Sequence, residues 1–210
     1  MSTTNCINEQ TLNDIAHGLD QHGFVFLAEF LPDSLAKQLY HEAKRLSVNE
    51  FKPAGIGRTT ASHLDAQIRT DSTLWLNGST LTQQCYLDCM EQLRIGLNQR
   101  LYMGLDDFEC HFSHYAKGQF YKRHLDAFKR DISDQRSHRF LSTVFYLNPN
   151  WQENDEGELL LYAEDQLIPF LTIPPMLNSC VLFLSDTFPH EVIASQTDRY
   201  SIAGWYRVKG

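Results

Sequence analysis

The sequence predicts an α+β protein in which helices from residues 1–105 pack on an antiparallel β core formed by residues 106–210. Two observations carry this prediction. Apolar residues recur at helical spacing in the first half, and short β-type runs separated by turn residues fill the second half. At 210 residues, 42% of them hydrophobic, the chain has the size of one domain, so we expect a single domain over residues 1–210.

Two helices and a strand are expected near the N-terminus. Residues 11–23 have the pattern of a helix that ends at Gly23, because glycine tolerates the left-handed conformation common at helix ends. Residues 24–31 form an apolar run typical of a strand. A second helix is expected over residues 32–47, where Pro32 and an aspartate are good helix-start residues and apolar residues follow at helical spacing.

A longer helix is expected over residues 80–103. Its apolar residues step by four from Cys85 through Cys89 to Leu101, which predicts one apolar stripe and places both cysteines in the core. Residues 52–72, between the second and third helices, contain Gly, Pro and many small polar residues. We therefore expect an exposed, mobile loop there.

Six short β-type runs follow in the second half. Their turn-separated spacing predicts a closed or double-layered antiparallel β structure. They cover residues 108–116, 139–148, 157–163, 179–185, 190–194 and 199–207.

Composition and charge exclude several classes of protein. A formal net charge of −8 and a pI near 5.5 would repel a phosphate backbone, so we do not expect a nucleic-acid partner. No apolar run approaches the roughly 20 residues of a membrane-spanning helix, and the N-terminus lacks the pattern of a signal peptide. The five cysteines have no dense spacing pattern, as is typical where thiols stay reduced. We expect no disulfide, a cytoplasmic location, no membrane contact and a monomeric protein.

His124, Asp126 and His190 form a candidate metal site. In an extended strand, residues i and i+2 point to the same face, so the side chains of His124 and Asp126 can reach one ion. A histidine from a neighbouring strand, His190, then completes a triangle on one side of the metal. Two histidines and one carboxylate in this arrangement suit iron(II) and leave positions open for a cosubstrate and dioxygen.

Short His-x-Asp matches also arise by chance, and most histidines bind nothing. Arg199 favours the metal hypothesis, because it is placed on the next strand of a β structure whose interior could hold an acidic ligand. A buried arginine needs an anion, and its planar guanidinium matches a carboxylate in a bidentate manner. Arg199 is thus a candidate anchor for a dicarboxylic cosubstrate.

Several motifs occur in a recognisable order. They are Ile68-Arg69-x-Asp71-x-x-x-Trp75, Tyr115-x-x-Gly118, Tyr121-x-x-His124-x-Asp126, Tyr146-Leu147-Asn148, Pro189-His190-Glu191-Val192, Arg199-Tyr200 and Trp205-Tyr206. With these motifs the chain resembles the prolyl 4-hydroxylase group of Fe(II)- and 2-oxoglutarate-dependent dioxygenases, and most closely the hypoxia-inducible-factor prolyl hydroxylases and their bacterial relatives. The resemblance implies a double-stranded β-helix, or jelly roll, supported by N-terminal helices.

The resemblance also implies roles for single residues. The three metal candidates are expected to bind Fe(II), and Arg199 with Tyr146 is expected to hold the C5 carboxylate of 2-oxoglutarate. Tyr115 is expected to face the metal-binding end of that cosubstrate. Dioxygen is the second cosubstrate, and ascorbate is a further candidate cofactor.

Five residues are expected to recognise the substrate by the same resemblance. They are Arg69, Asp71, Tyr121, Arg139 and Trp205. For Arg69 and Asp71 an alternative stays open, because two residues of opposite charge in a loop can form a solvated ion pair worth at most about 1 kcal/mol.

One segment departs from the family pattern. Family members often carry paired glycines before the strand that follows the Tyr-Leu-Asn run, whereas this sequence has Glu156-Gly157 after an acidic stretch. The resemblance therefore does not predict the loop shape at this point.

The resemblance implies hydroxylation of a prolyl residue in a protein, with release of succinate and carbon dioxide. Bacterial relatives with this pattern act on elongation factor Tu, and the wider family is associated with oxygen sensing. Three alternatives stay open. They are an oxygenase of a free amino acid or small molecule, a zinc-dependent hydrolase that uses the same three ligands, and a non-catalytic β-barrel that binds an acidic ligand or a partner protein.

Overall fold

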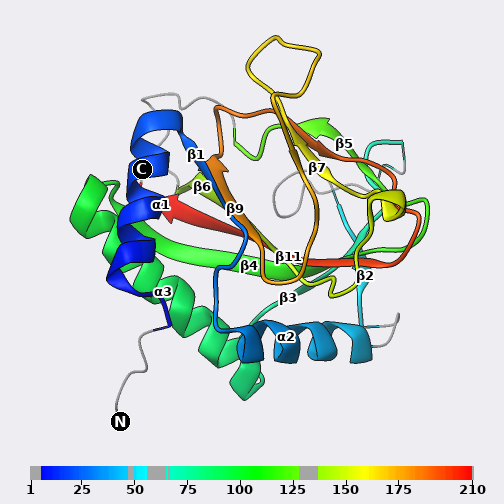
Figure 1. The fold of residues 1–210 in the computed structure, drawn as a ribbon, viewed down its shortest axis with the longest axis horizontal. Helices are drawn as coiled ribbons and strands as arrows, with labels where there is room; N and C mark the ends of the chain where they lie inside the picture. The colour runs from blue at the N-terminus through cyan, green and yellow to red at the C-terminus, as the bar shows by residue number, and fades with distance from the viewer. Residues whose placement is uncertain (1–5, 47–49, 56–64, 66, 128–136, 210) are drawn as a thin grey trace.

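The computed structural model describes residues 6–46, 50–55, 65, 67–127 and 137–209 (Figure 1). The helices are α1 (Glu9–His22), α2 (Asp33–Arg45), α3 (Leu81–Leu101) and the short 3-10 helix η2 (Glu153–Asp155). The strands are β1 (Phe24–Leu27), β2 (Lys52–Pro53), β3 (Ser72–Trp75), β4 (Leu105–Tyr115), β5 (Tyr121–His124), β6 (His138–Tyr146), β7 (Leu159–Leu161), β8 (Leu171–Ile173), β9 (Cys180–Leu184), β10 (His190–Val192) and β11 (Arg199–Val208).

The strands form two antiparallel sheets. The seven-stranded sheet has the order β1-β9-β6-β11-β4-β3-β2, and the four-stranded sheet has the order β5-β10-β7-β8. Figure 1 shows the helices on one side of the large sheet and strands β5 and β7 of the small sheet on the other. The predicted α+β class, with a double-layered antiparallel core, is confirmed.

Two apolar cores fill the spaces between these layers. Strand residues alternate between the two faces of a sheet, so the large sheet contributes one set of side chains to each core. Ile202 and Tyr206 of β11 join the helices in the larger core. Val144 of β6 and Val181 of β9 meet Leu159 of the small sheet in the second core. Polar residues on the second face therefore lie between the two sheets, where bulk water is excluded.

The first two helices follow the signals predicted for them. Gly23 ends α1 with φ 76°, and its N–H donates to the carbonyl oxygen of Leu19. Pro32 directly precedes α2, which buries Leu35 and Leu39 against the core. Within the described part of the chain, no helix combines the length and the apolar character needed to cross a bilayer.

Helix α3 corrects one prediction. Cys89 is buried as predicted, but Cys85 is exposed and does not belong to the core. Each helical residue turns by 100°, so a strict step of four drifts by about 40° around the axis. The buried face therefore follows mixed steps of three and four, through Tyr86, Cys89, Met90, Leu93 and Leu97.

The expectation of no disulfide is wrong. Cys6 and Cys89 form a disulfide, with Cα atoms 5.5 Å apart and a separation of 83 positions in the sequence. Helix α1 packs against α3, and this packing brings the segment before α1 to the middle of α3. Cysteine spacing does not predict such a pair, because the two cysteines come into contact only when the helices pack together.

The segment over residues 52–72 is not a loop at its ends. Strand β2 pairs with β3, and β3 pairs along its whole length with β4 of the large sheet. The N–H of Thr70 donates to the carbonyl oxygen of Phe120, at 3.1 Å, just before β5. The prediction of a loop is wrong for these paired ends, because composition does not reveal backbone pairing with distant strands. Lys52 and Pro53 are nevertheless exposed, as predicted. Residues 56–64 and 66, in the centre of the predicted mobile loop, lie outside the described residues.

Candidate active site

The three predicted metal ligands lie together at one end of the small sheet. His124 ends β5, His190 begins β10, and the two are register partners. Asp126 lies beyond the end of β5 in a bend, and not inside an extended strand as predicted. Its carboxylate oxygens lie 3.7 Å from Nε2 of His124 and 3.6 Å from Nε2 of His190. One ligand atom from each residue lies within 4.8 Å of the others.

Backbone carbonyl groups orient both imidazoles. Nδ1 of His124 lies 2.8 Å from the carbonyl oxygen of Lys122, and Nδ1 of His190 lies 3.0 Å from that of Phe188. A carbonyl oxygen only accepts, so each Nδ1 must carry the proton. Each Nε2 then presents its lone pair to the centre of the site, the tautomer that a metal needs.

The charges of the site favour an ionised Asp126 and a neutral His190. Burial alone raises the pKa of Asp126, but His190, a hydrogen bond with His124 and the charge of His124 outweigh burial and hold that pKa well below its usual range. Burial, together with nearby His124, lowers the pKa of His190 to about 4. Oγ of Ser142 donates to Oδ2 of Asp126 at 2.7 Å and fixes the carboxylate.

This donor set could hold a divalent transition-metal ion. Adjacent ligand atoms of an ion with bonds of about 2.1 Å lie about 3 Å apart, so the observed separations need only small side-chain rotations to close on one ion. All three side chains approach from one side. Two imidazoles and one carboxylate in a facial arrangement are the donor set of non-haem iron(II) sites that react with dioxygen.

Arg199 lies between the two sheets at the start of β11 and is buried. Its Nε donates to the carbonyl oxygen of Gly157 at 2.7 Å, and its Nη1 donates to Oγ of Ser201 at 3.2 Å. The rings of Tyr115 and Tyr146 flank the guanidinium, with centroids 4.9 Å and 5.3 Å from Cζ. No carboxylate within the described part of the chain pairs with this charge.

Two polar atoms in this place lack a hydrogen-bond partner. They are Nη2 of Arg199 and the hydroxyl of Tyr146, and both are buried. Burial raises the pKa values of the Tyr115 and Tyr146 hydroxyls, so both stay protonated and can donate. Buried donors without partners are costly, and a carboxylate can accept from both. The site therefore fits the carboxylate of an acidic cosubstrate.

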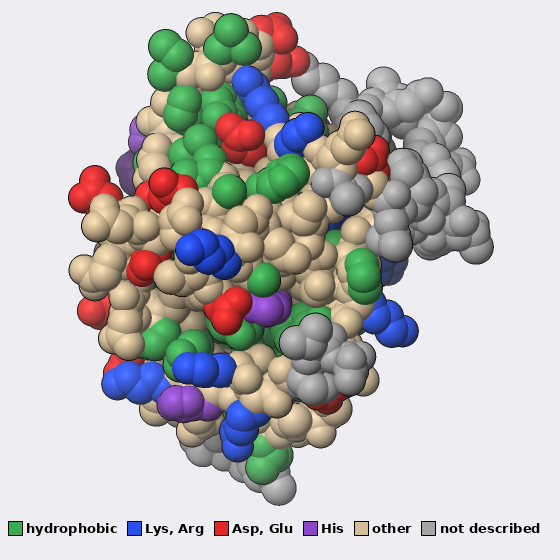
Figure 2. Space-filling view, turned by 90° about the vertical axis from the view of Figure 1, so that its right-hand side faces the viewer, with side chains coloured by type: hydrophobic (Ala, Val, Ile, Leu, Met, Phe, Trp, Pro, Cys, Tyr) green, Lys and Arg blue, Asp and Glu red, His purple; other side chains and the backbone are tan. Residues whose placement is uncertain are grey.

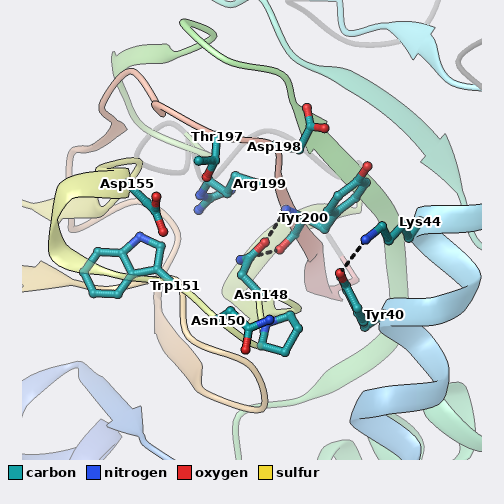
Figure 3. Close-up of a pocket in the computed structure, with 11 residues that line it drawn as sticks. Tyr40, Lys44, Asn148, Asn150, Trp151, Asp155, Thr197, Asp198, Arg199 and Tyr200 are labelled. Atoms are coloured by element: carbon teal, nitrogen blue, oxygen red, sulfur yellow. Dashed lines mark hydrogen bonds between the residues drawn. The ribbon is translucent and has the colours of Figure 1, made fainter.

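A hollow of about 290 Å³ borders Arg199 (Figure 3). Figure 3 shows Asn148 joined by two hydrogen bonds to the backbone of Tyr200. The amide oxygen accepts from the N–H of Tyr200 at 2.8 Å, and the amide nitrogen donates to its carbonyl oxygen at 3.0 Å. This cross-link ties the end of β6 to the start of β11, and so keeps Tyr146 beside Arg199.

The Glu156-Gly157 segment keeps a glycine-like backbone although the first residue is not glycine. Glu156 has φ 52° and ψ −154°, a region occupied almost only by glycine, and Gly157 has φ 80°. A Cβ atom at Gly157 would lie 3.2 Å from Cδ of Arg199 and 3.0 Å from Cβ of Ser195. The loop shape that paired glycines would give is thus retained beside Arg199, with Glu156 held under backbone strain.

The predicted substrate residues Arg139 and Trp205 lie against each other. Cζ of Arg139 lies 3.5 Å from the ring centroid of Trp205, and its Nε donates to Glu109 at 2.9 Å. The half-exposed ring of Trp75 lies 6.4 Å from Trp205. Trp205 is the register partner of Ser142, the residue that holds the candidate metal ligand Asp126. This aromatic cluster therefore adjoins the metal site.

Arg69, Asp71 and Tyr121 also come together, in a place that the sequence did not predict. Arg69 bonds Asp71 in a bidentate manner, with distances of 2.8 and 2.7 Å, and the carboxylate side chain has no exposed surface. The guanidinium lies over the ring of Tyr121 at 4.2 Å. The alternative of a solvated ion pair is therefore wrong, because the side chain of Arg69 is only 12% exposed and that of Asp71 is fully buried.

An exposed apolar loop rises from the same end of the small sheet as the metal residues. Leu161, at the end of β7, is the register partner of both His190 and Leu171, so the loop between β7 and β8 leaves the sheet at the level of His190. Leu167 is 89% exposed and Ile168 is 81% exposed. Figure 2 shows hydrophobic side chains gathered at the top of this face, where the loop lies.

The fold and the site together define a class. Two facing antiparallel sheets that enclose a two-histidine, one-carboxylate site and a buried arginine characterise the oxygenases that use a non-haem metal and a dicarboxylic cosubstrate. Residues 110–207 match the profile of the 2OG-Fe(II) oxygenase superfamily. The chain belongs to this superfamily and, within it, to the prolyl hydroxylases, because a solved prolyl-4-hydroxylase is 37% identical to it over 95% of the chain. Its cofactor and cosubstrates are therefore Fe(II), 2-oxoglutarate and dioxygen.

Solved structures support the same assignment. A Pseudomonas putida prolyl-4-hydroxylase is 37% identical, with 95% of this chain and 100% of that chain covered and a TM-score of 0.81. A Trichoplax adhaerens prolyl hydroxylase, solved with a hypoxia inducible factor peptide, is 28% identical, with 94% and 89% covered and a TM-score of 0.79. The predicted jelly roll is confirmed.

Human Egl nine homolog 1 is 25% identical over 195 residues, which cover 90% of this chain. The chain spans only 44% of the length of that relative. Membership in the superfamily decides against the zinc-dependent hydrolase and the non-catalytic β-barrel.

Sequence reasoning missed several residues that support the site. Ser142 and Ser201 bond Asp126 and Arg199, and Asn148 was noted only as part of a motif. The missing signal is strand register, because Ser142 is recognisable only as the partner of Trp205 across β6 and β11.

The unpartnered hydroxyl of Tyr146 leads to a prediction about stability. Tyr146→Phe removes a buried group without a partner, so we expect the free energy of unfolding to stay constant or rise by up to about 1 kcal/mol. Tyr206 is the matched control, because its equally buried hydroxyl donates to the carbonyl oxygen of Met90 at 2.7 Å. We expect Tyr206→Phe to lose about 1 kcal/mol. Urea unfolding without cosubstrate measures both, and equal losses would show that the Tyr146 hydroxyl is satisfied inside the protein.

The strained backbone at Glu156 leads to a second stability prediction. Glu156→Gly should raise the free energy of unfolding by about 1 kcal/mol, because the relief of strain exceeds the added entropy of glycine in the unfolded chain. Glu153→Gly, in the exposed 3-10 helix η2, is the control and should lower stability. Thermal and urea unfolding of both variants test this, and a loss of stability in Glu156→Gly would contradict the strain.

Proposed function

We propose that this chain hydroxylates a prolyl residue in a protein, with Fe(II) bound by His124, Asp126 and His190 and 2-oxoglutarate anchored by Arg199. The observation that carries the proposal is the pair of buried donors without partners, on Arg199 and Tyr146. Tyr146 belongs to the same apolar core as Phe183, whose ring packs on the metal candidate His190. In a metal-binding protein without an acidic cosubstrate, these buried donors would stay without an acceptor and would only lower stability.

Each residue of the site has a task in this reaction. Arg199 and Tyr146 donate to the C5 carboxylate of 2-oxoglutarate, and Ser201 keeps the guanidinium in place. Tyr115 faces the other end of the cosubstrate. The charge on the buried arginine is balanced when a carboxylate is bound. A dicarboxylate can meet Arg199 with one end and the metal with the other, which a smaller acid cannot do.

The bound metal and cosubstrate supply the oxidant: one oxygen atom of O₂ enters a C–H bond of the substrate, while the other converts 2-oxoglutarate to succinate and carbon dioxide. The protein orients the reactants and excludes water. The two imidazoles and the ionised Asp126 fix the ligand side of the site. The side chains of Val144, Val181 and Phe183 close the space between the sheets and keep the reaction away from bulk solvent.

Exposed apolar groups near the metal residues support a protein as the substrate. The half-exposed Trp75 lies beside Trp205 and Arg139, and Leu167 and Ile168 extend from the same end of the small sheet. Exposed apolar surface beside a site is typical of contact with another macromolecule. A free amino acid would touch none of the loop residues.

Elongation factor Tu is the specific substrate that we propose, and cytoplasm the location in which the two proteins meet. The support is the resemblance to bacterial prolyl hydroxylases that act on this factor, together with the 37% identity to a Pseudomonas putida prolyl-4-hydroxylase. Arg139 and Trp205 are the residues that we expect to recognise the target proline.

The proposed function predicts turnover that depends on iron and on a protein substrate. The purified chain, loaded with Fe(II) without oxygen and then given O₂ and 2-oxoglutarate, should release succinate and add one oxygen atom to a proline of elongation factor Tu, measured by mass spectrometry. Asp126→Ala should abolish both products, because the site loses its anionic ligand. Hydroxylation of free proline but of no protein would contradict the proposal. Hydroxylation of a hypoxia-inducible-factor peptide, but not of elongation factor Tu, would show that elongation factor Tu is not the substrate.

The anchor role of Arg199 predicts a selective loss of cosubstrate affinity. Arg199→Ala should weaken 2-oxoglutarate binding by about 2 kcal/mol, roughly 30-fold, because a charge-assisted contact in a buried place is lost. Binding of Co(II) in place of Fe(II) should stay within about 2-fold of the wild type. Arg207→Ala, on the same strand but partly exposed and paired with Asp107, is the control that should change neither. Calorimetric titration measures both affinities, and unchanged 2-oxoglutarate binding in Arg199→Ala would exclude the anchor.

A further inference from the structure

The two histidines of the metal site are held in different ways. His190 has a side chain only 5% exposed, and the ring of Phe183 from the core packs on it edge-on at 4.8 Å. His124 is more open, with 16% of its side chain exposed. Core packing therefore fixes His190, whereas His124 depends on something else.

The ring of Tyr121 covers one face of His124. The two ring centroids lie 3.6 Å apart, and the planes differ by 14°, so the rings are stacked. The hydrogen bond from Nδ1 of His124 to the carbonyl oxygen of Lys122 is a single contact, about which the imidazole can still tilt. A parallel ring against its face removes that freedom, and so sets the direction in which Nε2 points.

Arg69 and Asp71 continue the stack on the far side of Tyr121. The guanidinium of Arg69 lies 4.2 Å from the Tyr121 ring centroid, which adds a cation–π contact. The buried Asp71 bonds the guanidinium twice, and the carbonyl oxygen of Gly55 accepts a third bond from it at 3.3 Å. Burial alone lowers the pKa of Arg69, but Asp71 outweighs burial and raises it, so the guanidinium stays charged.

Backbone pairing fixes the same neighbours. Arg69 and Tyr121 are partners in an antiparallel bridge, so their side chains lie on one face. The N–H of Lys122 donates to the carbonyl oxygen of Ile68 at 2.8 Å, next to the bridge. Residues 68–70 thus extend the small sheet beyond β5, and the chain that leads into β3 lies directly beside the strand that carries His124.

We propose that Arg69 and Tyr121 are positioning residues for the metal site, which hold the His124 imidazole in its metal-binding orientation through a stack anchored by Asp71. The inference rests on the proposed function, because it takes His124 to be a metal ligand. It gives Arg69, Asp71 and Tyr121 a task different from the substrate contact that the sequence suggests. Arg69 and Asp71, just before β3, reach the candidate metal site through this stack.

The first test is metal binding by two variants, with Co(II) as the probe and without cosubstrate or protein substrate. Tyr121→Leu removes the ring, and the double variant Arg69→Met/Asp71→Asn removes the anchor without leaving a buried charge. Each should weaken Co(II) binding about 3- to 10-fold, the range that an aromatic stack contributes, and should change the visible absorption spectrum of bound Co(II), which reports ligand geometry. Tyr121→Phe keeps the ring, so this variant should have the Co(II) affinity and the Co(II) spectrum of the wild type.

A matched control is available in a second stack. Tyr200 lies parallel to His114, with centroids 4.7 Å apart and planes 13° apart, but His114 is not among the candidate ligands. Tyr200→Leu should leave Co(II) affinity and spectrum unchanged. A similar loss in this variant would show that any lost stack disturbs the fold, and would overturn the positioning role.

Other outcomes separate the rival roles. A lower melting temperature in Tyr121→Leu with unchanged Co(II) affinity and spectrum would make the stack merely structural and overturn the proposal. If Tyr121→Leu raised the KM for the protein substrate and left metal binding unchanged, Tyr121 would contact the substrate instead. That result would also overturn the positioning role. His124→Ala tests the proposed function separately: undiminished Co(II) binding there would remove His124 from the ligands, and the positioning role with it.

Discussion

The register of β11 between β4 and β6 is the constraint on which the site depends. This strand is hydrogen-bonded on both sides, so none of its residues can turn to the other face without a shift of the whole strand. Arg199 and Trp205 thereby face the small sheet, whereas Ile202 and Tyr206 face the helices. One strand carries the cosubstrate anchor, the wall beside the metal and three side chains of the helix-facing core, Ile202, Tyr206 and Val208. A slip by one residue would disrupt all three.

Unsatisfied donors explain why a folded protein keeps polar groups in such a place. The buried guanidinium of Arg199 and the hydroxyl of Tyr146 reduce the stability of the free protein, because their hydrogen-bonding capacity is not met. Binding of a carboxylate recovers this free energy. Glu156 likewise lowers stability for the benefit of the site. Its glycine-like backbone is strained, and the next residue, Gly157, accepts a hydrogen bond from Arg199 through its carbonyl oxygen. The buried groups that lower the stability of the free protein are thus the same groups that bind the carboxylate.

The buried pair of Arg69 and Asp71 shows how a segment outside the jelly roll becomes part of its site. Composition predicts a mobile loop over residues 52–72, but the described ends of that segment pair with β4 and β5. Through Tyr121 the buried pair reaches His124, whereas the core ring of Phe183 packs directly on His190. A metal site with one ligand fixed by the core and one supported by a separate segment can be changed by mutations far from the ligands.

The sequence by itself determined the class, the three long helices and the three metal candidates, because these depend on local periodicity and on motifs a few residues long. It also indicated Arg199, since a charged residue inside a β structure requires an anion. Only the tertiary structure decided the rest. Packing of the two sheets brings Ser142 to Asp126, and helix docking joins Cys6 to Cys89. Burial makes the pair of Arg69 and Asp71 an anchor for Tyr121. Each of these contacts joins residues whose proximity arises from packing, and a linear sequence does not contain the distances that packing creates.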